Sequence, residues 1–239
     1  MLFLCFAVKD RVPIINDIYQ MLLNFGLDIW YDRRNLYLGD DRYEHNITLG
    51  VDNPQIKYAV IFYSDNFKNG NICLDEYRIL EERYSRGEVH IFPVFIDDIP
   101  EDIDVRFQLC KKLVFKQLVT PQDLWGLCLH IVAKITTDEL AGASFTSIED
   151  ILFSFPDKET TAYKLLIEYD NICKENYTMR IGVLFCLYML LSNSLPVNYM
   201  HYKTMHHIYY RNCSEPVCDE RRELQIMENI IIYEFGSLR

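Results

Sequence analysis

The sequence lacks the features that mark membrane spans, export and nucleic-acid binding. Its longest apolar stretch runs from Ile181 to Leu191, and these 11 residues are too few to cross a bilayer. Lys9, Asp10 and Arg11 interrupt the apolar start, so the N-terminus does not follow the pattern of a signal peptide. The net charge is −11, and no clustered basic face is visible that could contact a phosphate backbone. We therefore expect no membrane and no nucleic-acid partner.

The eight cysteines do not show the paired spacing of a disulfide framework. They stand singly, several of them inside apolar runs where a free thiol packs as a small hydrophobe, and this predicts a reduced, cytoplasmic protein. A metal site is suggested only by the group His201, His206, His207, Cys213 and Cys218. Its spacing lacks the tight pairing of zinc fingers, and a helix would turn the two adjacent histidines to different faces. We expect no metal, and no Gly-rich phosphate loop is recognisable.

What the first 136 residues do contain is an alternation of short apolar runs with segments of helical periodicity. The candidate strands cover 2–8, 27–31, 58–64, 90–96 and 112–115. The helix-like segments cover 14–25, which Gly26 ends, and roughly 40–50, 72–86 and 121–135. Uninterrupted apolar strands that alternate with helices are typical of a parallel sheet covered on both faces. The prediction is an α/β fold with a flavodoxin-like, five-stranded parallel sheet.

The remaining residues carry helical signals. The small, polar segment 136–150 is interpreted as a linker or a capped helix between two domains, 1–136 and 137–239. Asp157 is expected to cap a helix, the stretch 181–191 to form a buried core helix that Pro196 interrupts, and Ser214, with Pro216 close behind, to start the last helix. The apolar positions expected in the first and last of these helices are Tyr163, Leu166, Ile167, Ile172, Leu224, Met227, Ile230 and Ile231. The second domain is predicted to be small and all-α.

Three sequence blocks lie in order at predicted strand ends, where ligands bind in parallel sheets. They are FLCFAVKD at 3–10, GLDIWYDRRNLYLGD at 26–40 and YSDNFKNGNICLDEY at 63–77. The blocks resemble the opening strand, the second strand with its BB loop, and the Trp-Cys-Leu-x-Glu segment of the TIR (Toll/interleukin-1 receptor) family. Cys5 and Ala7 stand where serines are usual. The resemblance covers about 1–136 and is to bacterial NAD⁺-cleaving members of the antiphage-defence (Thoeris-like) type.

The resemblance implies that Glu76 is a catalytic carboxylate and that NAD⁺ is the substrate, with no separate cofactor. Cleavage of the nicotinamide–ribose bond builds positive charge on the ribose, and the leaving group is already a cationic pyridinium. One carboxylate therefore suffices, and no general acid is needed. We expect Asn71 to be the helix N-cap, so that Glu76 lies in the first turns of the third helix, where the dipole favours its ionised form unless burial outweighs it. The alternative is that Asp75 and Glu76 are ordinary acidic residues of a first turn.

Further contacts to NAD⁺ are implied by the same resemblance. The candidates are Phe6, Ala7, Lys9, Asp10, Arg33, Leu36, Ser64, Asp65, Asn66, Ile72 and Cys73. Ile72 stands where the family often has a tryptophan that stacks on the substrate, and it offers no aromatic face. Phe6 and Tyr31 are candidates to replace it, although both also fit strand packing. The BB loop, 32–42, resembles a flap over the pocket that also mediates assembly, so we expect a homo-oligomer.

Two functional hypotheses remain open. The leading one is an NAD⁺ glycohydrolase or ADP-ribosyl cyclase of bacterial antiphage immunity, whose product a downstream effector protein senses. The other is a non-enzymatic TIR adaptor that acts through its BB loop, for which Glu76→Ala is harmless and changes at Leu38 or Gly39 abolish function. A phosphoacceptor receiver on the same fold needs an acidic pair after the first strand and an aspartate at the end of the third. Lys9-Asp10 and Ser64 supply neither.

Overall fold

The computed structural model describes residues 1–96, 99, 101, 103–120, 122–193, 198–214 and 220–237. It divides into two compact units, Met1–Leu23 with Leu27–Leu127, and Asn24–Gly26 with Cys128–Arg239. The division falls inside helix α7 (Gln122–Glu139), so this one continuous helix has residues in both units. The limits of the two predicted domains, 1–136 and 137–239, stay a prediction.

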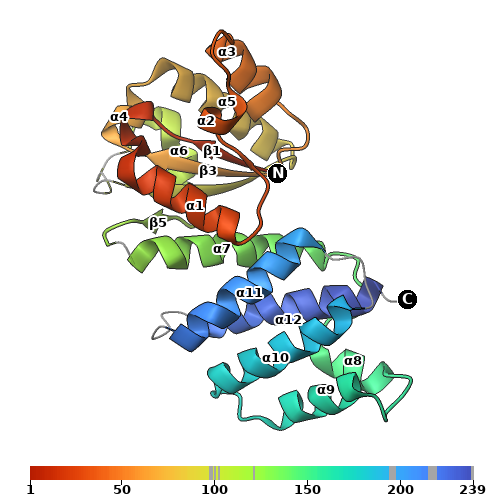
Figure 1. Cartoon of the computed structure of the whole chain (residues 1–239). Helices are drawn as coiled ribbons and strands as arrows, with labels where there is room; N and C mark the ends of the chain where they lie inside the picture. The colour runs from red at the N-terminus through yellow and green to blue at the C-terminus, as the bar shows by residue number, and fades with distance from the viewer. Residues whose placement is uncertain are drawn as a thin grey trace. The chain divides into compact units, whose positions relative to one another are not determined.

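The first unit is built on a five-stranded parallel sheet (Figure 1) in the order β2-β1-β3-β4-β5. The strands are β1 (Leu2–Cys5), β2 (Ile29–Trp30), β3 (Tyr58–Tyr63), β4 (His90–Phe95) and β5 (Lys116–Gln117). The order reverses between β1 and β3, which is the flavodoxin-like arrangement. Successive residues of β1 and β3 point to opposite faces, and both sets are buried, so both faces of the sheet are covered. The predicted fold class is confirmed.

Short and long helices connect these strands. They are α1 (Asn16–Asn24), α2 (Asp32–Asn35), α3 (Arg42–Glu44), α4 (Asp65–Lys68), α5 (Asn71–Ser85) and α6 (Gln108–Lys112), with short helical segments η1 (Val8–Asp10), η2 (Arg11–Ile15), η3 (His45–Val51) and η4 (Val105–Phe107). Gly26 adopts a φ of 79°, and the N–H of Leu27 donates to the carbonyl of Leu22 at 3.3 Å. This is the glycine helix end that the sequence predicted.

The fifth strand does not lie where the apolar run predicted it. Lys112 ends α6, Val114 is 94% exposed, and the strand forms at residues 116–117 instead. Its position is set by pairing with β4, where Val94 faces Lys116 and Phe95 faces Gln117. A short strand at the edge of a sheet needs little apolar character, because one side of it stays open to solvent. The prediction of 112–115 was therefore wrong.

Three predicted helix starts were also wrong. Gly70 precedes α5 with no side-chain cap, and Asn71 is the first helical residue. Thr160, not Asp157, caps α9, because its Oγ1 accepts the N–H of Tyr163 at 3.2 Å. Ser214 ends a helix instead of starting one, and its Oγ donates to the carbonyl of residue 210 at 2.9 Å. A polar residue near a helix end is able to cap the helix or to bond within it, and the sequence alone does not decide between the two. Pro196 and Pro216 lie outside the described residues.

The second unit is helical, as predicted. Its helices are α8 (Ile148–Ser154), α9 (Thr161–Asn171), α10 (Tyr177–Ser192), α11 (Tyr199–Ser214) and α12 (Glu220–Ser237), together with the second half of α7. The apolar stretch 181–191 is the centre of α10, which packs against α12, and five of its eleven residues are buried: Ile181, Leu184, Leu187, Tyr188 and Leu191. Ser147 caps α8 within the segment expected to be a linker or a capped helix. Among the described residues, no helix has the length and apolar character to span a membrane.

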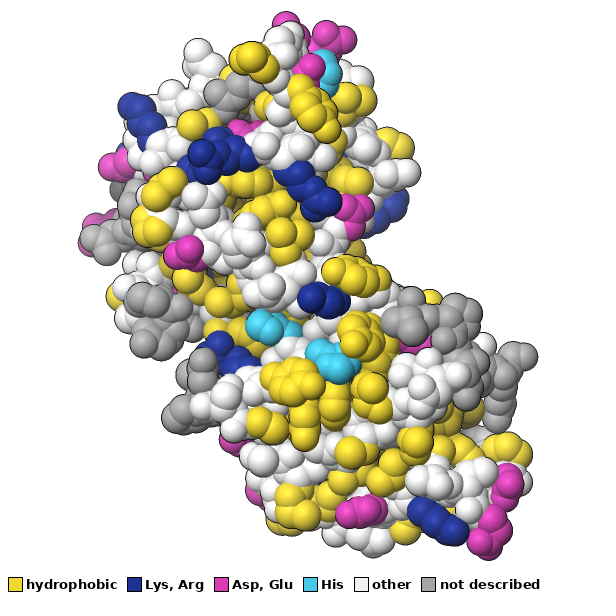
Figure 2. All heavy atoms as spheres, viewed as in Figure 1, with side chains coloured by type: hydrophobic (Ala, Val, Ile, Leu, Met, Phe, Trp, Pro, Cys, Tyr) yellow, Lys and Arg dark blue, Asp and Glu magenta, His cyan; other side chains and the backbone are white. Residues whose placement is uncertain are grey.

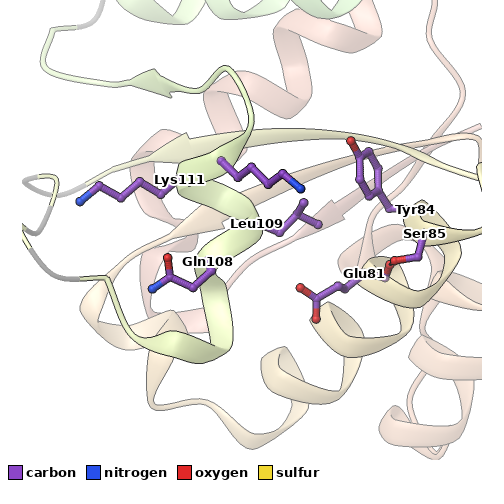
Figure 3. A pocket seen from close by; sticks show the side chains of 7 residues that line it. Glu81, Tyr84, Ser85, Gln108, Leu109 and Lys111 are labelled. Atoms are coloured by element: carbon purple, nitrogen blue, oxygen red, sulfur yellow. The ribbon is translucent and has the colours of Figure 1, made fainter.

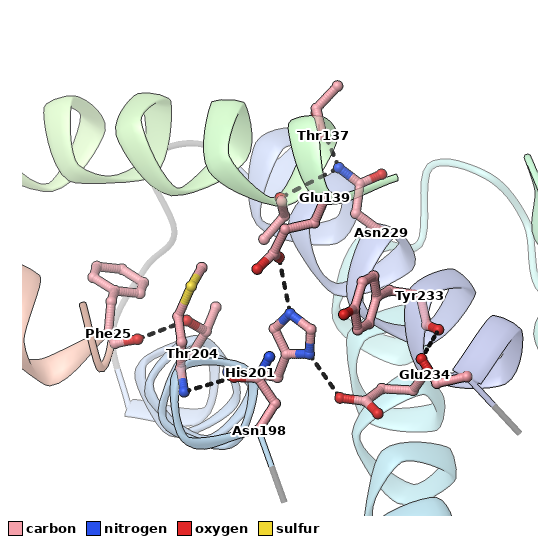
Figure 4. A network of polar contacts seen from close by, with 12 residues as sticks. Phe25, Thr137, Glu139, Asn198, His201, Thr204, Asn229, Tyr233 and Glu234 are labelled. Atoms are coloured by element: carbon pink, nitrogen blue, oxygen red, sulfur yellow. Dashed lines mark hydrogen bonds and ion pairs between the residues drawn. The ribbon is translucent and has the colours of Figure 1, made fainter. Parts of the chain in front are cut away.

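A buried histidine joins three helices of this second unit (Figure 4). His201 of α11 is fully buried and contacts Glu234 of α12 through Nδ1 at 2.7 Å and Glu139 of α7 through Nε2 at 2.9 Å. Burial by itself lowers the pKa of His201, but the hydrogen bonds to the two carboxylates outweigh it and the pKa is raised. Thr204, one turn further along α11, donates to the carbonyl of Phe25 at 2.9 Å. His201 thus has a structural role.

Candidate functional site

Glu76 is a buried carboxylate that faces the first strand. It is the sixth residue of α5, counted from Asn71, and only 5% of it is exposed. The thiol of Cys5 donates to Glu76 Oε2 at 3.3 Å. Burial, followed by the neighbouring Glu76 charge, raises the pKa of Cys5 well above its usual value, so this partner is a neutral thiol and a weak donor. Because the helix dipole fades after the first turn, it supports Glu76 less than the sequence led us to expect.

A small cavity of about 30 Å³ lies beside Glu76. It is lined by Phe3, Leu4, Phe6, Val8, Trp30, Asp32, Asn46, Ile72, Cys73 and Glu76. This volume is close to that of one water molecule, whereas pockets for small organic ligands usually measure about 300–1,000 Å³. The cavity as it stands is therefore too small for the nicotinamide riboside half of a dinucleotide.

An open groove of about 530 Å³ adjoins this cavity. It is lined by Ala7, Val8, Lys9, Asp65, Asn66, Asn69, Gly70, Asn71, Ile72 and Cys73. Val8, Ile72 and Cys73 line both hollows, so these three residues form the wall between them. The groove lies beyond the carboxyl ends of β1 and β3, next to the point where the strand order reverses. Its size and position are those of a ligand site.

Most of the residues expected around the substrate come together in these two hollows. Ala7, Lys9, Asp65 and Asn66 line the groove, Phe6 and Glu76 line the cavity, and Ile72 and Cys73 line both. Arg33 and Leu36 of the BB loop are not among the described residues that line either hollow. Contact of any of these side chains with NAD⁺ stays a prediction.

Asp10 and Ser64 hold the strand ends together. The Ser64 hydroxyl donates to Asp10 Oδ2 and accepts the N–H of Phe67 at 2.9 Å, which caps α4. Asn66 Nδ2 donates to the other Asp10 oxygen at 2.5 Å. Ser64 is buried, so its hydroxyl is engaged within the protein. The three residues therefore fix the end of β3 to η1, beside the groove.

Three aromatic side chains line the cavity where the usual tryptophan is replaced by Ile72. Phe6 was suggested by the sequence as a replacement, whereas Phe3 and Trp30 were not. Tyr31 stacks instead on Tyr19 with ring centroids 4.4 Å apart, and it is not among the described residues that line the cavity. Trp30 lies beside Phe3 in the sheet and points to the same face as Cys5. Alternate residues of a strand share a face, so Phe3 and Cys5 point the same way, and Trp30 pairs with Phe3. This reasoning would have identified Trp30 from the sequence if the register between β1 and β2 had been known.

An arginine that the sequence did not single out connects the cavity to the BB loop. Arg11 forms an ion pair with Asp32, the first residue of α2 and a member of the cavity lining. Its guanidinium also lies 5.4 Å from the ring centroid of Phe6 and 5.7 Å from that of Tyr31. Cation–π contact of this kind adds to the ion pair when both are partly buried. Arg11 thereby holds the start of the BB loop against the end of β1.

The tip of the BB loop presents apolar side chains to solvent. Leu38 is fully exposed and Tyr37 is 78% exposed. The turn is closed by Asp40, whose carboxylate accepts the N–H of Tyr37 at 2.7 Å, and Gly39 adopts a φ of 101° that a larger residue would find strained. The loop therefore has a defined turn with an unburied leucine at its tip.

A further hollow of about 550 Å³ lies between α5 and α6 (Figure 3). It is lined by Glu81, Tyr84, Ser85, Gln108, Leu109, Lys111 and Lys112. Side chains of both charges share this surface, and none of the three TIR-like blocks contributes to it. It is therefore set apart from the candidate site.

The histidines of α11 separate from one another, so the metal candidates do not form one group. His206 packs edge-on against Phe185 at 5.0 Å, whereas His207 packs edge-on against Phe25 at 4.8 Å. Figure 2 shows hydrophobic and histidine side chains together on this part of the surface. Within the described part of the chain, which does not include Cys218, no group of three or more His, Cys, Asp or Glu side chains is arranged to hold a metal ion.

Comparison with known proteins gives one family and two relatives. A family model described as TIR domain matches residues 2–124. The 2′ cyclic ADP-D-ribose synthase BtTIR of Bacteroides thetaiotaomicron is 29% identical over 105 residues, which cover 44% of this chain and 35% of that enzyme. The match thus spans about a third of the length of the relative. The TIR domain of the Toll-related receptor TRR-2 from Hydra magnipapillata is 18% identical, with a TM-score of 0.42, over 56% of this chain and 95% of that one.

Proposed function

Because the chain belongs to the TIR domain family, over residues 2–124, we propose that it cleaves NAD⁺ at the nicotinamide–ribose bond with Glu76 as the catalytic carboxylate. The observation that carries the proposal is the position of Glu76. It is a buried acid behind the wall of a groove at the carboxyl ends of β1 and β3, which is where ligands bind in this class of sheet. The similarity to a bacterial cyclic ADP-ribose synthase supports the same substrate.

The residues around Glu76 suit this chemistry. As the glycosidic bond breaks, its electron pair moves to the nicotinamide nitrogen, which becomes neutral, and the ribose acquires positive charge. A carboxylate in an apolar cavity stabilises that charge strongly, because little water is present to screen it. Phe3, Leu4 and Phe6 provide such a surrounding. The thiol of Cys5 donates to one carboxylate oxygen, Oε2, and the carboxylate borders the cavity.

The groove suits the remainder of the dinucleotide. Lys9 is exposed at its edge and can pair with the pyrophosphate, while Asn66 and Asn69 offer amide groups to ribose hydroxyls. For the ribose to reach Glu76, the wall formed by Val8, Ile72 and Cys73 has to move. Val8 and Ile72 are partly exposed, so a small displacement of their side chains opens the cavity into the groove. We propose that substrate binding or assembly brings this about.

The cellular setting is part of the proposal. An NAD⁺-cleaving TIR protein either depletes NAD⁺ or makes an ADP-ribose-derived signal for an effector protein, and both suit bacterial antiphage immunity. The relative named for a cyclic product favours a signal. The exposed Leu38 at the tip of the BB loop favours assembly into a homo-oligomer.

Mass spectrometry of NAD⁺ incubated with the full chain tests the proposed function. The protein is used at high concentration with a crowding agent, so that any required assembly takes place. Wild type is expected to release nicotinamide together with ADP-ribose or a cyclic product, and Glu76→Ala to release none above background. Glu82→Ala is the matched control, because Glu82 is an exposed acid of the same helix outside both hollows. Equal release from wild type and Glu76→Ala contradicts the proposal.

A TIR adaptor without enzymatic activity is the second candidate. The exposed Tyr37 and Leu38 favour it, because they provide a contact surface whether or not NAD⁺ is cleaved. In that case Glu76→Ala leaves partner binding unchanged, whereas Leu38→Asp abolishes it. The same pair of variants, assayed for nicotinamide release and for self-association, separates the two functions.

A further inference from the structure

Two residues that line the Glu76 cavity each have a buried polar atom with no hydrogen-bond partner in the described part of the chain. Neither Trp30 Nε1 nor Asn46 Oδ1 has a hydrogen-bond partner among the described residues. Trp30 is 8% exposed and Asn46 is 5% exposed, and both line the cavity. Burying a donor and an acceptor unpaired costs free energy, so such atoms usually serve a bound molecule.

The two atoms come from elements that close the cavity opposite α5. Trp30 lies in β2, and Asn46 lies in η3, four residues before Gly50. The indole nitrogen lies so close to Gly50 that an added Cβ there would be 2.8 Å from it. Asn46 and Gly50 are about one helical turn apart and share a face of η3. The fold therefore brings a donor, an acceptor and the Glu76 carboxylate to one small space.

The volume and the polar groups of this space fit a single water molecule. A buried water needs room for about one probe sphere and usually makes about three hydrogen bonds. A water bound there would accept from the Trp30 N–H and donate to the Asn46 amide oxygen and the Glu76 carboxylate. Phe3, Leu4 and Phe6 add apolar walls, and the Asp32 carboxylate in the lining is engaged by Arg11 and by the N–H of Arg33, so a second water finds little to bind. The tryptophan and the asparagine thus fix both the place and the orientation of one oxygen atom.

We propose that Trp30 and Asn46 position the water molecule that attacks the ribose, so that they set the share of hydrolysis in the reaction. This inference rests on the proposed NAD⁺ cleavage. The C1′–N bond breaks with its electron pair going to nicotinamide, and the water oxygen forms the new bond to C1′. One water proton passes to Glu76 and then to solvent. The products are ADP-ribose, nicotinamide and one proton.

A hydroxyl group of the same substrate competes with this water. When a ribose hydroxyl captures C1′ in place of water, the product is a cyclic ADP-ribose and the hydroxyl proton leaves through Glu76. Loss of the positioned water therefore diverts the intermediate to cyclisation, or to an added alcohol, without preventing cleavage. The ratio of products reports on the water site, whereas nicotinamide release reports on cleavage itself.

The test is the product ratio of the full chain incubated with NAD⁺ in buffer that contains methanol. Asn46→Leu removes the acceptor, and Trp30→Phe removes the N–H but keeps an aromatic ring. In both variants we expect the ratio of ADP-ribose to cyclic and methyl products to fall about tenfold, the factor that corresponds to one lost hydrogen bond. Trp125→Phe is the matched control, because Trp125 is the other of the two tryptophans, is also buried, and lies in α7 outside the cavity lining. Its product ratio is expected to equal that of wild type.

Three outcomes overturn the inference. Product ratios that equal wild type in Trp30→Phe and in Asn46→Leu show that the cavity does not hold the attacking water. Wild-type protein that releases nicotinamide but forms no ADP-ribose shows that water is not the nucleophile. Wild-type protein that releases no nicotinamide removes the proposed function and this inference with it. If Asn46→Leu does not fold, Trp30→Phe alone decides, since phenylalanine preserves most of the packing.

Discussion

The two units of the molecule differ in the hydrogen-bond donors that contact their buried glutamates. In the helical unit, His201 lies between Glu234 and Glu139, and hydrogen bonds join all three side chains. In the α/β unit, Glu76 accepts a hydrogen bond from the thiol of Cys5, which stays neutral. A buried charge is tolerated when an opposite charge and good hydrogen bonds offset its desolvation. The first arrangement places a histidine of raised pKa between two carboxylates, and the second includes a thiol that donates while staying neutral.

The difference separates a structural site from a candidate catalytic one. The His201 network joins α7, α11 and α12, and it uses both imidazole nitrogens within the protein. Glu76 borders a cavity with two further buried polar atoms and a groove behind its wall. A buried carboxylate that borders a cavity and a groove is placed where a substrate can contact it. Replacing His201 should therefore lower the stability of the helical unit, whereas replacing Glu76 should lower the activity of the α/β unit.

The largest effect is expected for Glu76→Gln, which keeps the shape of the side chain and removes its charge. Nicotinamide release should fall on the order of 10²–10³-fold, the size of effect seen when one transition-state stabilising group is removed. The free energy of unfolding should stay within about 1 kcal/mol of wild type, because the amide keeps the shape of the side chain and its oxygen still accepts from Cys5. Nicotinamide assays and urea denaturation of the same preparation check both statements. If Glu76→Gln loses stability but not nicotinamide release, Glu76 has the structural role and is not the catalytic residue.

The next largest effect is expected for His201→Leu, this time on stability. Removing the imidazole leaves Glu139 and Glu234 without the cation between them, and breaking a buried ion pair typically costs about 3–5 kcal/mol. Urea denaturation should show this loss, and the double variant His201→Leu/Glu234→Leu should recover part of it. Tm values within a degree or so of wild type for His201→Leu would show that the network contributes little.

A smaller effect is expected of pH on the contribution of His201 to the free energy of unfolding. The pKa of His201 is raised in the folded protein, because its carboxylate hydrogen bonds outweigh burial, so the protonated form stabilises the fold. This stabilisation is fully present below the unfolded pKa of about 6.5 and is lost as the pH rises through the folded pKa. His206 and His207 have lowered pKa values, chiefly from burial, and act in the opposite direction. The difference in unfolding free energy between wild type and His201→Gln, followed by urea denaturation from pH 6 upwards, should therefore shrink as the pH rises.

The smallest effect on the fold is expected for Leu38→Asp. Leu38 is fully exposed, so its replacement should change the unfolding free energy by no more than about 0.5 kcal/mol. If the BB loop mediates assembly, the variant loses nicotinamide release at low protein concentration and regains part of it at high concentration, by mass action. Light scattering at the same concentrations checks whether assembly follows activity. Activity that is lost at every concentration, with assembly intact, points to a direct role of the loop at the groove.

Local patterns in the sequence predicted much of this molecule. The apolar runs at 58–64 and 90–96 became β3 and β4, because strands buried on both faces have to be apolar throughout. Gly26 ended its helix, since it alone accepts a positive φ there without strain. The start of α5 and the position of β5 were not predicted. At both places several local choices are close in energy, and pairing or packing with distant residues decides among them.

The sequence by itself determined the α/β architecture of the first unit, the helical character of the second, and the position of Glu76 on the helix after β3 and α4. Only the tertiary structure decided which residues surround that carboxylate. Cys5, Trp30 and Asn46 are far from Glu76 along the chain and meet it because β1, β2 and η3 converge on one face of α5. The same holds for His201, whose partners are 62 and 33 residues away. Periodicity fixes which face of an element is buried, but not which distant side chain lies opposite it.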